Sequence, residues 1–297
     1  MTKAQSAARF LLYSVWAVVM TALTYILGAA SLKVLRRKSG RAVFWGLTTA
    51  LSIGIYAVQF KILALAFFSL VVLMGVFSEL EELGLSFNVS AFFTLVINSL
   101  IGAGAFILWM SITGPKWSAQ LLAVVESVLK PLETYNPGVE VKYFDLMLQL
   151  PSVILIMWMA AIYLSILLES RVVKEESVSS KNPTMRQQLM EFRVPDACVW
   201  IFILALLGKF GGLGGQTVEA LSANALNVCF LLFFFQGIAV VGRSFEKLRM
   251  GMLWQTLFMV LIVVYLFLFV SVLGLADYWF DFRSKLSKRS EEFERET

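Results

Sequence analysis

Histidine is absent from this 297-residue chain, and cysteine occurs only twice, at Cys198 and Cys229. The absence of histidine excludes catalysis by a histidine base and metal binding through imidazole. Both cysteines fall in apolar segments, where a thiol is ordinarily an inert buried group. We therefore expect no catalytic residues, no metal site and no cofactor, and we expect that the protein is not an enzyme.

Charge is also scarce. Charged residues make up 15% of the chain, against about 25% in a soluble domain. Hydrophobic residues make up 59%, and the mean hydropathy is +0.79. A soluble fold of this size needs more polar surface, whereas in a bilayer apolar side chains face hydrocarbon. The formal charge of +5 then indicates basic loops beside lipid head groups. We expect membrane lipids as partners and no nucleic acid.

The apolar residues are grouped in long segments. A helix needs about 20 mostly apolar residues to cross a bilayer. The sequence predicts an all-α, polytopic bundle of about eight spanning helices, in a single transmembrane domain over residues 1–289 with a solvated tail over 290–297. The predicted spans are 10–30, 43–59, 62–80, 89–113, 149–168, 196–213, 221–241 and 252–276.

Two features complicate the span count. Only Phe60 and Lys61 separate the second and third segments, which predicts a tight helical hairpin. The sixth segment ends in a glycine cluster that disfavours helix, so residues 196–215 either span or form a re-entrant segment. Lys and Arg are divided 13 to 12 between the two sides of an eight-span topology, so their distribution gives no orientation.

Three connecting segments have distinct compositions. Residues 31–42 form a basic loop, and residues 169–195 form a loop of mixed charge. In the 115–148 loop, apolar residues from Trp117 to Leu129 recur at helical spacing. This pattern predicts an amphipathic helix, lying either on the membrane surface or against neighbouring loops.

Amide side chains occur inside the apolar segments, where they are costly and often functional. We name four of them as the lining of a polar pocket for a small solute: Asn98, Asn224, Asn227 and Gln236. The alternative is that they form hydrogen bonds between helices, each about 0.6–2 kcal/mol. Lys209 either extends to the membrane surface or neutralises Glu219 across the glycine turn.

Three stretches in the C-terminal half carry a resemblance. They are Phe192–Asp196, Phe233–Val241 and Gly274–Arg283. In this order and spacing they resemble the YybS-like family of bacterial multi-pass membrane proteins, a domain of unknown function (number 2232). The resemblance implies the bacterial inner (cytoplasmic) membrane and no particular activity. In architecture the family is distantly similar to the substrate-binding membrane subunits of energy-coupling-factor transporters.

The same stretches suggest specific contacts. Arg193 and Asp196 are placed to pair with each other, and Gln236 beside Gly237 is placed to bond across a close helix contact. We expect six residues to hold the tail at the membrane surface or contact a partner: Arg193, Asp196, Asp277, Trp279, Asp281 and Arg283.

Two functional hypotheses follow. The first is a solute-binding or transport component, which would need partner subunits for active transport because the chain has no nucleotide-binding domain. The second is a non-catalytic membrane scaffold or assembly subunit of a larger complex, with other membrane proteins as partners.

Overall fold

The computed structural model describes residues 3–135, 143–172, 191–212, 214–247, 254, 258, 261–262 and 265–285. Every regular element in these residues is a helix, as the all-α class predicts. The sequence indicated one domain, and the structure divides into two compact units. Unit 1 comprises Met1–Met147 and Ile154–Arg186, and unit 2 comprises Leu148–Val153 and Gln187–Thr297.

Unit 1 begins with two helices where the sequence predicted a single span over 10–30. Helix α1 ends at Leu23, Thr24 is extended (φ −149°, ψ 117°), and α2 packs back on α1. Gly28 permits this contact, since a Cβ there would overlap the Thr21 side chain. The expected basic loop over 31–42 is instead mostly helix, because α2 continues to Ser39. The bounds are α1 Lys3–Leu23 and α2 Tyr25–Ser39.

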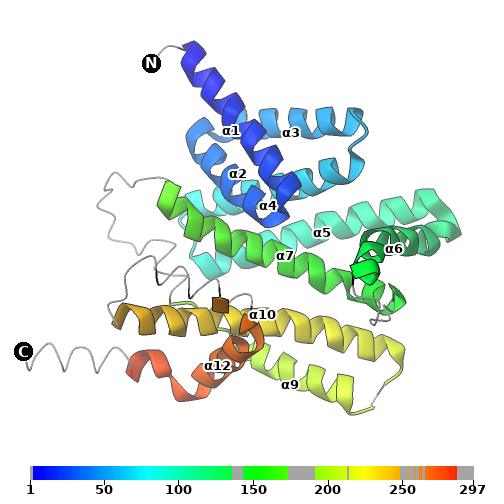
Figure 1. Ribbon diagram of the computed structural model, residues 1–297, viewed down its shortest axis with the longest axis vertical. Helices are drawn as coiled ribbons and strands as arrows, with labels where there is room; N and C mark the ends of the chain where they lie inside the picture. Colours follow the sequence, from blue (N-terminus) through cyan, green and yellow to red (C-terminus); the bar gives the residue numbers. More distant parts are fainter. Residues whose placement is uncertain are drawn as a thin grey trace, which may run out of the picture. The chain divides into compact units, whose positions relative to one another are not determined.

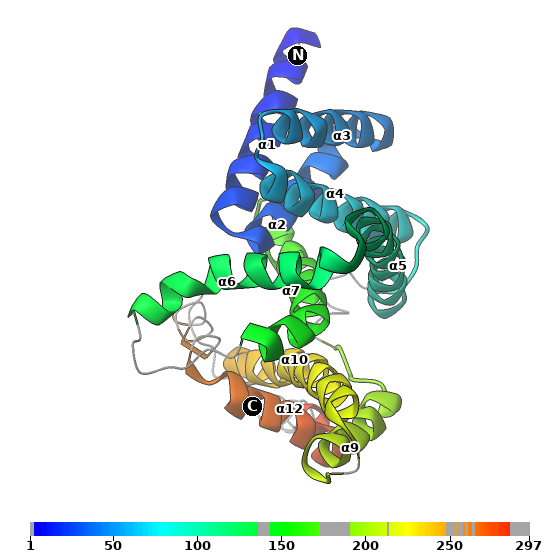
Figure 2. The same ribbon diagram turned by 90° about the vertical axis from the view of Figure 1, so that its right-hand side faces the viewer.

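The next helices follow the predicted segments more closely. A three-residue turn joins α3 to α4, and the two helices pack together as the expected hairpin (Figure 1). Gly114 then turns the chain (φ 64°), so that α6 leaves the end of α5 in a new direction (Figure 2). Helix α6 is the helix predicted within 115–148. The bounds are α3 Arg41–Ala57, α4 Lys61–Glu82, α5 Phe87–Thr113, η1 Gly114–Lys116 and α6 Trp117–Tyr135.

Helix α7 contributes to both units and contains Pro151. Unit 2 also holds a hairpin of α9 and α10, in which Lys209 Nζ lies 2.6 Å from Glu219 Oε1. This ion pair supports the neutralising interpretation of Lys209. Helix α12 packs on α10. The bounds are α7 Tyr143–Val172, α9 Asp196–Phe210, α10 Gln216–Lys247 and α12 Phe267–Phe280.

Eight spans are not confirmed. Four helices of the described chain are long and apolar enough to cross a membrane. Helix α9 has 15 residues, about 22 Å at 1.5 Å per residue, which is less than the hydrocarbon thickness of about 30 Å. The predicted span over 252–276 is only partly described, and Leu266 precedes a shorter helix there. The four are Lys61–Glu82, Phe87–Lys130, Tyr143–Leu168 and Gln216–Phe245.

Candidate functional site

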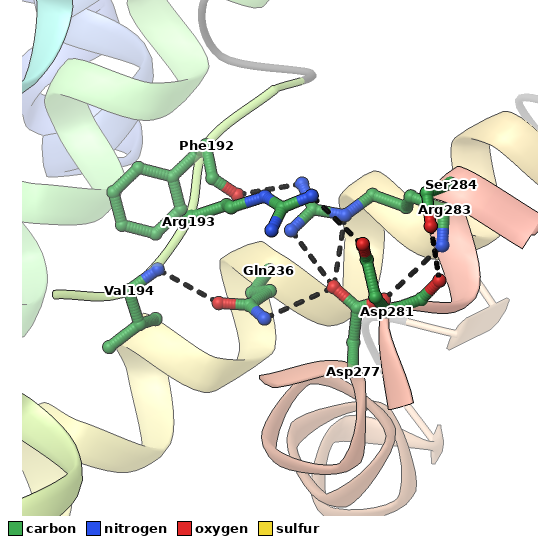
Figure 3. A network of polar contacts seen from close by, with 8 residues as sticks. All are labelled: Phe192, Arg193, Val194, Gln236, Asp277, Asp281, Arg283 and Ser284. Atoms are coloured by element: carbon green, nitrogen blue, oxygen red, sulfur yellow. Dashed lines mark hydrogen bonds and ion pairs between the residues drawn. The ribbon is translucent and has the colours of Figure 1, made fainter. Parts of the chain in front are cut away.

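The three stretches that carry the family resemblance meet in unit 2 around Gln236, near the middle of α10 (Figure 3). Gln236 is 2% exposed. Its Oε1 accepts a hydrogen bond from Val194 N (2.8 Å), and its Nε2 donates to Asp277 Oδ2 (3.1 Å). One amide therefore joins the segment before α9 to the end of α12, as expected for a glutamine at a close helix contact.

Close packing of α10 on α12 makes this geometry possible. A Cβ on Gly237 would overlap Val270 O, and a Cβ on Gly274 would overlap Phe233 O. Small residues at facing positions let two helix backbones approach closely, which is how membrane helices gain packing energy. The two glycines thus bring Asp277 within reach of Gln236.

Asp277 is also the ion-pair partner of Arg283. Arg283 Nε lies 3.0 Å and Nη2 2.9 Å from Asp277 Oδ2, and Nη1 donates to Phe192 O at 2.8 Å. Asp281 adopts a left-handed conformation (φ 44°, ψ 56°), which turns the chain so that Arg283 folds back on α12. Asp277 is 3% exposed and Arg283 8%. Both side chains are therefore buried inside unit 2, where they hold the residues after α12 against that helix.

The rim of this network is exposed to the surroundings. Arg193 Nη2 contacts Asp281 Oδ1 at 2.9 Å, and the Tyr278 hydroxyl donates to Asp196 Oδ1 at 2.9 Å. The expected pairing of Arg193 with Asp196 is therefore wrong, because Asp196 binds Tyr278 in the last turn of α12 and Arg193 binds Asp281 just after it. The Ser284 hydroxyl, and to a lesser extent Arg193, lowers the pKa of Asp281. Trp279 is 60% exposed beside them.

The proposed pocket residues separate into three places. Asn224 and Asn227 lie together in unit 2, and Gln236 is 12 residues further along α10, about 18 Å at 1.5 Å per residue. Asn98 belongs to α5 in unit 1. The structure therefore brings two of the four together, and the other two have their own surroundings.

Asn224 bridges a backbone pair of α7. Its Nδ2 donates to Leu148 O (2.8 Å) and its Oδ1 accepts from Ser152 N (2.9 Å), the two groups that a regular helix joins directly. Pro151, which lacks an N–H and crowds the preceding turn, lies between them. Asn227 Nδ2 donates to Ser152 Oγ at 3.1 Å. Both asparagines thus serve contacts between helices, the alternative that the sequence left open.

Asn98 has a different environment. Ser90, Thr94 and Asn98 recur at every fourth position of α5 and are buried, whereas residues 100–108 beyond them are exposed. Within the described residues, Thr94 Oγ1 and Asn98 Nδ2 have no hydrogen-bond partner, nor does Ser78 Oγ on the adjacent α4. Buried polar atoms without partners are rare in native proteins and indicate an unseen ligand or water.

Sequence reasoning missed a charged cluster where α2 and α4 end. Arg36 Nη2 lies 3.1 Å from Glu79 and 2.9 Å from Glu82, and Lys33 Nζ lies 3.2 Å from Glu81. The Lys33 and Arg36 side chains are 3% and 4% exposed. Three carboxylates within four positions after an apolar run were the available signal.

Comparisons with known proteins agree with the membrane assignment. A family model described as "Predicted membrane protein (DUF2232)" matches residues 4–278. No curated protein and no solved structure matches the chain. The matched range contains Asp277 and all four amides of the proposed pocket, Gln236 among them.

Proposed function

This chain belongs to the DUF2232 family of predicted membrane proteins, and from that premise we propose that it is a solute-binding component of a transport system. The bacterial inner membrane is its proposed location, in line with the family resemblance. In this proposal the protein binds its solute without chemical conversion, and its sequence has no histidine that could act as a general base. Partner subunits would supply the energy for transport.

The observation that carries this proposal is the row of unpartnered polar atoms on α5. Thr94 is 0% and Asn98 4% exposed, yet Oγ1 and Nδ2 find no acceptor or donor in the described chain. Leaving a buried polar group unsatisfied costs about 1–3 kcal/mol. A bound solute that hydrogen-bonds to these atoms would recover this cost, and sites built for ligands commonly reduce the stability of the empty protein.

The test compares binding with stability. Asn98→Leu removes an unsatisfied amide, so the purified variant should unfold at the same or a higher temperature than the parent protein. It should also lose a small molecule that co-purifies with the parent protein and is detected by native mass spectrometry.

The matched control is Asn88→Leu, the same change at an exposed position of the same helix. It should retain the small molecule. The proposal is wrong if the parent protein carries no small molecule, or if Asn98→Leu retains it.

A second candidate is a membrane scaffold or assembly subunit. The observation that favours it is the network that fixes the end of α12 and leaves Trp279 and Phe280 60% and 57% exposed. Aromatic and arginine side chains on a rigid support are typical of binding hot spots. Trp279→Ala should then release a co-purifying subunit without changing the unfolding temperature.

A further inference from the structure

Three polar side chains from different helices meet inside unit 1. Trp158 Nε1 on α7 lies 3.0 Å from both Tyr25 Oη on α2 and Ser69 Oγ on α4. The two hydroxyl oxygens are themselves 3.0 Å apart. The indole N–H can only donate, so both hydroxyl oxygens accept from it. One of the two hydroxyls donates to the other.

Asn98 adds donors on the side of α5 that faces Trp158. A Cβ on Gly102 would lie 3.7 Å from the Trp158 ring, and Asn98 precedes Gly102 by one helical turn on the same face. The Asn98 amide contributes two N–H groups, and Thr94, a further turn along, contributes a hydroxyl. Neither has a partner among the described residues. This part of unit 1 therefore holds an amide donor, Asn98 Nδ2, and a hydroxyl, Thr94 Oγ1, that are buried and have no partner in the described chain.

The depth of these groups limits the charge of what binds there. Asn98 lies 11 residues from the start of α5 at Phe87, about 16 Å along the helix and close to half of a hydrocarbon core of about 30 Å. The charged cluster of Lys33, Arg36 and Glu79 lies at the other end of α2 from Tyr25. A charged ligand would be expensive here, because no opposite charge is present among the donors.

We propose that Tyr25, Ser69, Thr94, Asn98 and Trp158 form a binding site for a neutral, lipid-soluble molecule whose oxygens accept hydrogen bonds. The chemical class is a carbonyl compound with few donors of its own. Two sources offer such a carbonyl: a free quinone-type molecule, and the ester carbonyl of a bilayer phospholipid. This inference rests on the proposed function and specifies its ligand class.

The experiment uses the full chain in nanodiscs of dialkyl (ether-linked) phosphatidylcholine, which carries no carbonyl. Ubiquinone-1, a short-chain benzoquinone, is the probe. It should raise the unfolding temperature of the parent protein and of Asn88→Leu. For Asn98→Leu and Thr94→Val, the apparent affinity should fall about tenfold, the usual consequence of one lost hydrogen bond.

A second arm tests the lipid source. If the ester carbonyl is the ligand, diacyl phosphatidylcholine should raise the unfolding temperature relative to the dialkyl lipid, and Asn98→Leu should abolish that difference. Either positive arm supports the inference and identifies the source.

Failure of the inference is distinguishable from failure of the proposed function. If mass spectrometry finds a charged solute that is lost in Asn98→Leu, solute binding stands and the neutral carbonyl class is overturned. If neither arm responds and no solute co-purifies, both are overturned, and ordered water alone satisfies these donors.

Discussion

Removing the Asp277 carboxylate is the sharpest test of the buried network in unit 2. Asp277→Leu leaves the Arg283 guanidinium, 8% exposed, without its counter-charge. It also removes the acceptor of the Gln236 amide. Stranding one member of a buried ion pair costs about 3–5 kcal/mol, so we expect a loss of that size in the free energy of unfolding.

The double variant Asp277→Leu/Arg283→Leu separates the stranded charge from the rest of the network. It leaves no stranded charge and breaks only neutral contacts: the Gln236 bond to Asp277, the Arg283 bond to Phe192 O, and the long bond (3.4 Å) from Arg283 N to Asp277. At about 1 kcal/mol for each of the two shorter bonds, the expected loss in the free energy of unfolding falls to about 2 kcal/mol. The double variant should therefore be more stable than the single variant, which is the opposite of additive behaviour.

The assay is unfolding in mixed micelles by titration with a denaturing detergent, followed by tryptophan fluorescence. Arg193→Leu is the control, since its ion pair with Asp281 has side chains 64% and 42% exposed. An exposed pair contributes less than about 1 kcal/mol. The reasoning is refuted if Asp277→Leu loses no more than this control, or if the double variant is less stable than Asp277→Leu.

Three further predictions concern single contacts. Asn224→Leu should lower the free energy of unfolding by about 1–3 kcal/mol, because Leu148 O and Ser152 N both lose their hydrogen bond to Asn224. In the same assay, Asn224→Leu/Pro151→Ala should recover most of this loss. Gly274→Leu should lower the free energy of unfolding by about 3 kcal/mol, because the new side chain would push α12 away from Phe233 O. Gly104→Leu is the control and should unfold like the parent protein, because a Cβ there would meet nothing within 4 Å. The pKa of Asp281 is lowered in the folded state, so the stability it contributes is present above its ordinary value of 3.8 and is lost as the pH falls through the folded value. Asp281→Asn should therefore unfold at a lower temperature than the parent protein at pH 6, and this difference should disappear near pH 2.

Hydropathy along the chain was sufficient to predict a membrane environment and an all-α fold. Hydrophobicity over a window of about 20 residues depends on composition alone, so helices α4, α5, α7 and α10 are anticipated by their apolar segments. The polar residues that matter were also visible, because an amide or carboxylate in an apolar segment is conspicuous wherever it points. The stretches around Val194, Gln236 and Asp277 were identified by their resemblance to the family, and only Gln236 stands out as an amide within an apolar segment.

Which of these residues contact one another depends on how the helices pack, and the packing could not be predicted from the sequence. The break at Thr24 depends on Gly28 fitting against Thr21 within a helix pair, and hydropathy contains no term for that contact. Likewise, Arg193 pairs with Asp281 and not with Asp196, because the left-handed turn at Asp281 brings the end of α12 next to the start of α9. Pairing between side chains depends on which helix faces touch across large sequence separations, and composition and periodicity within one segment cannot specify that.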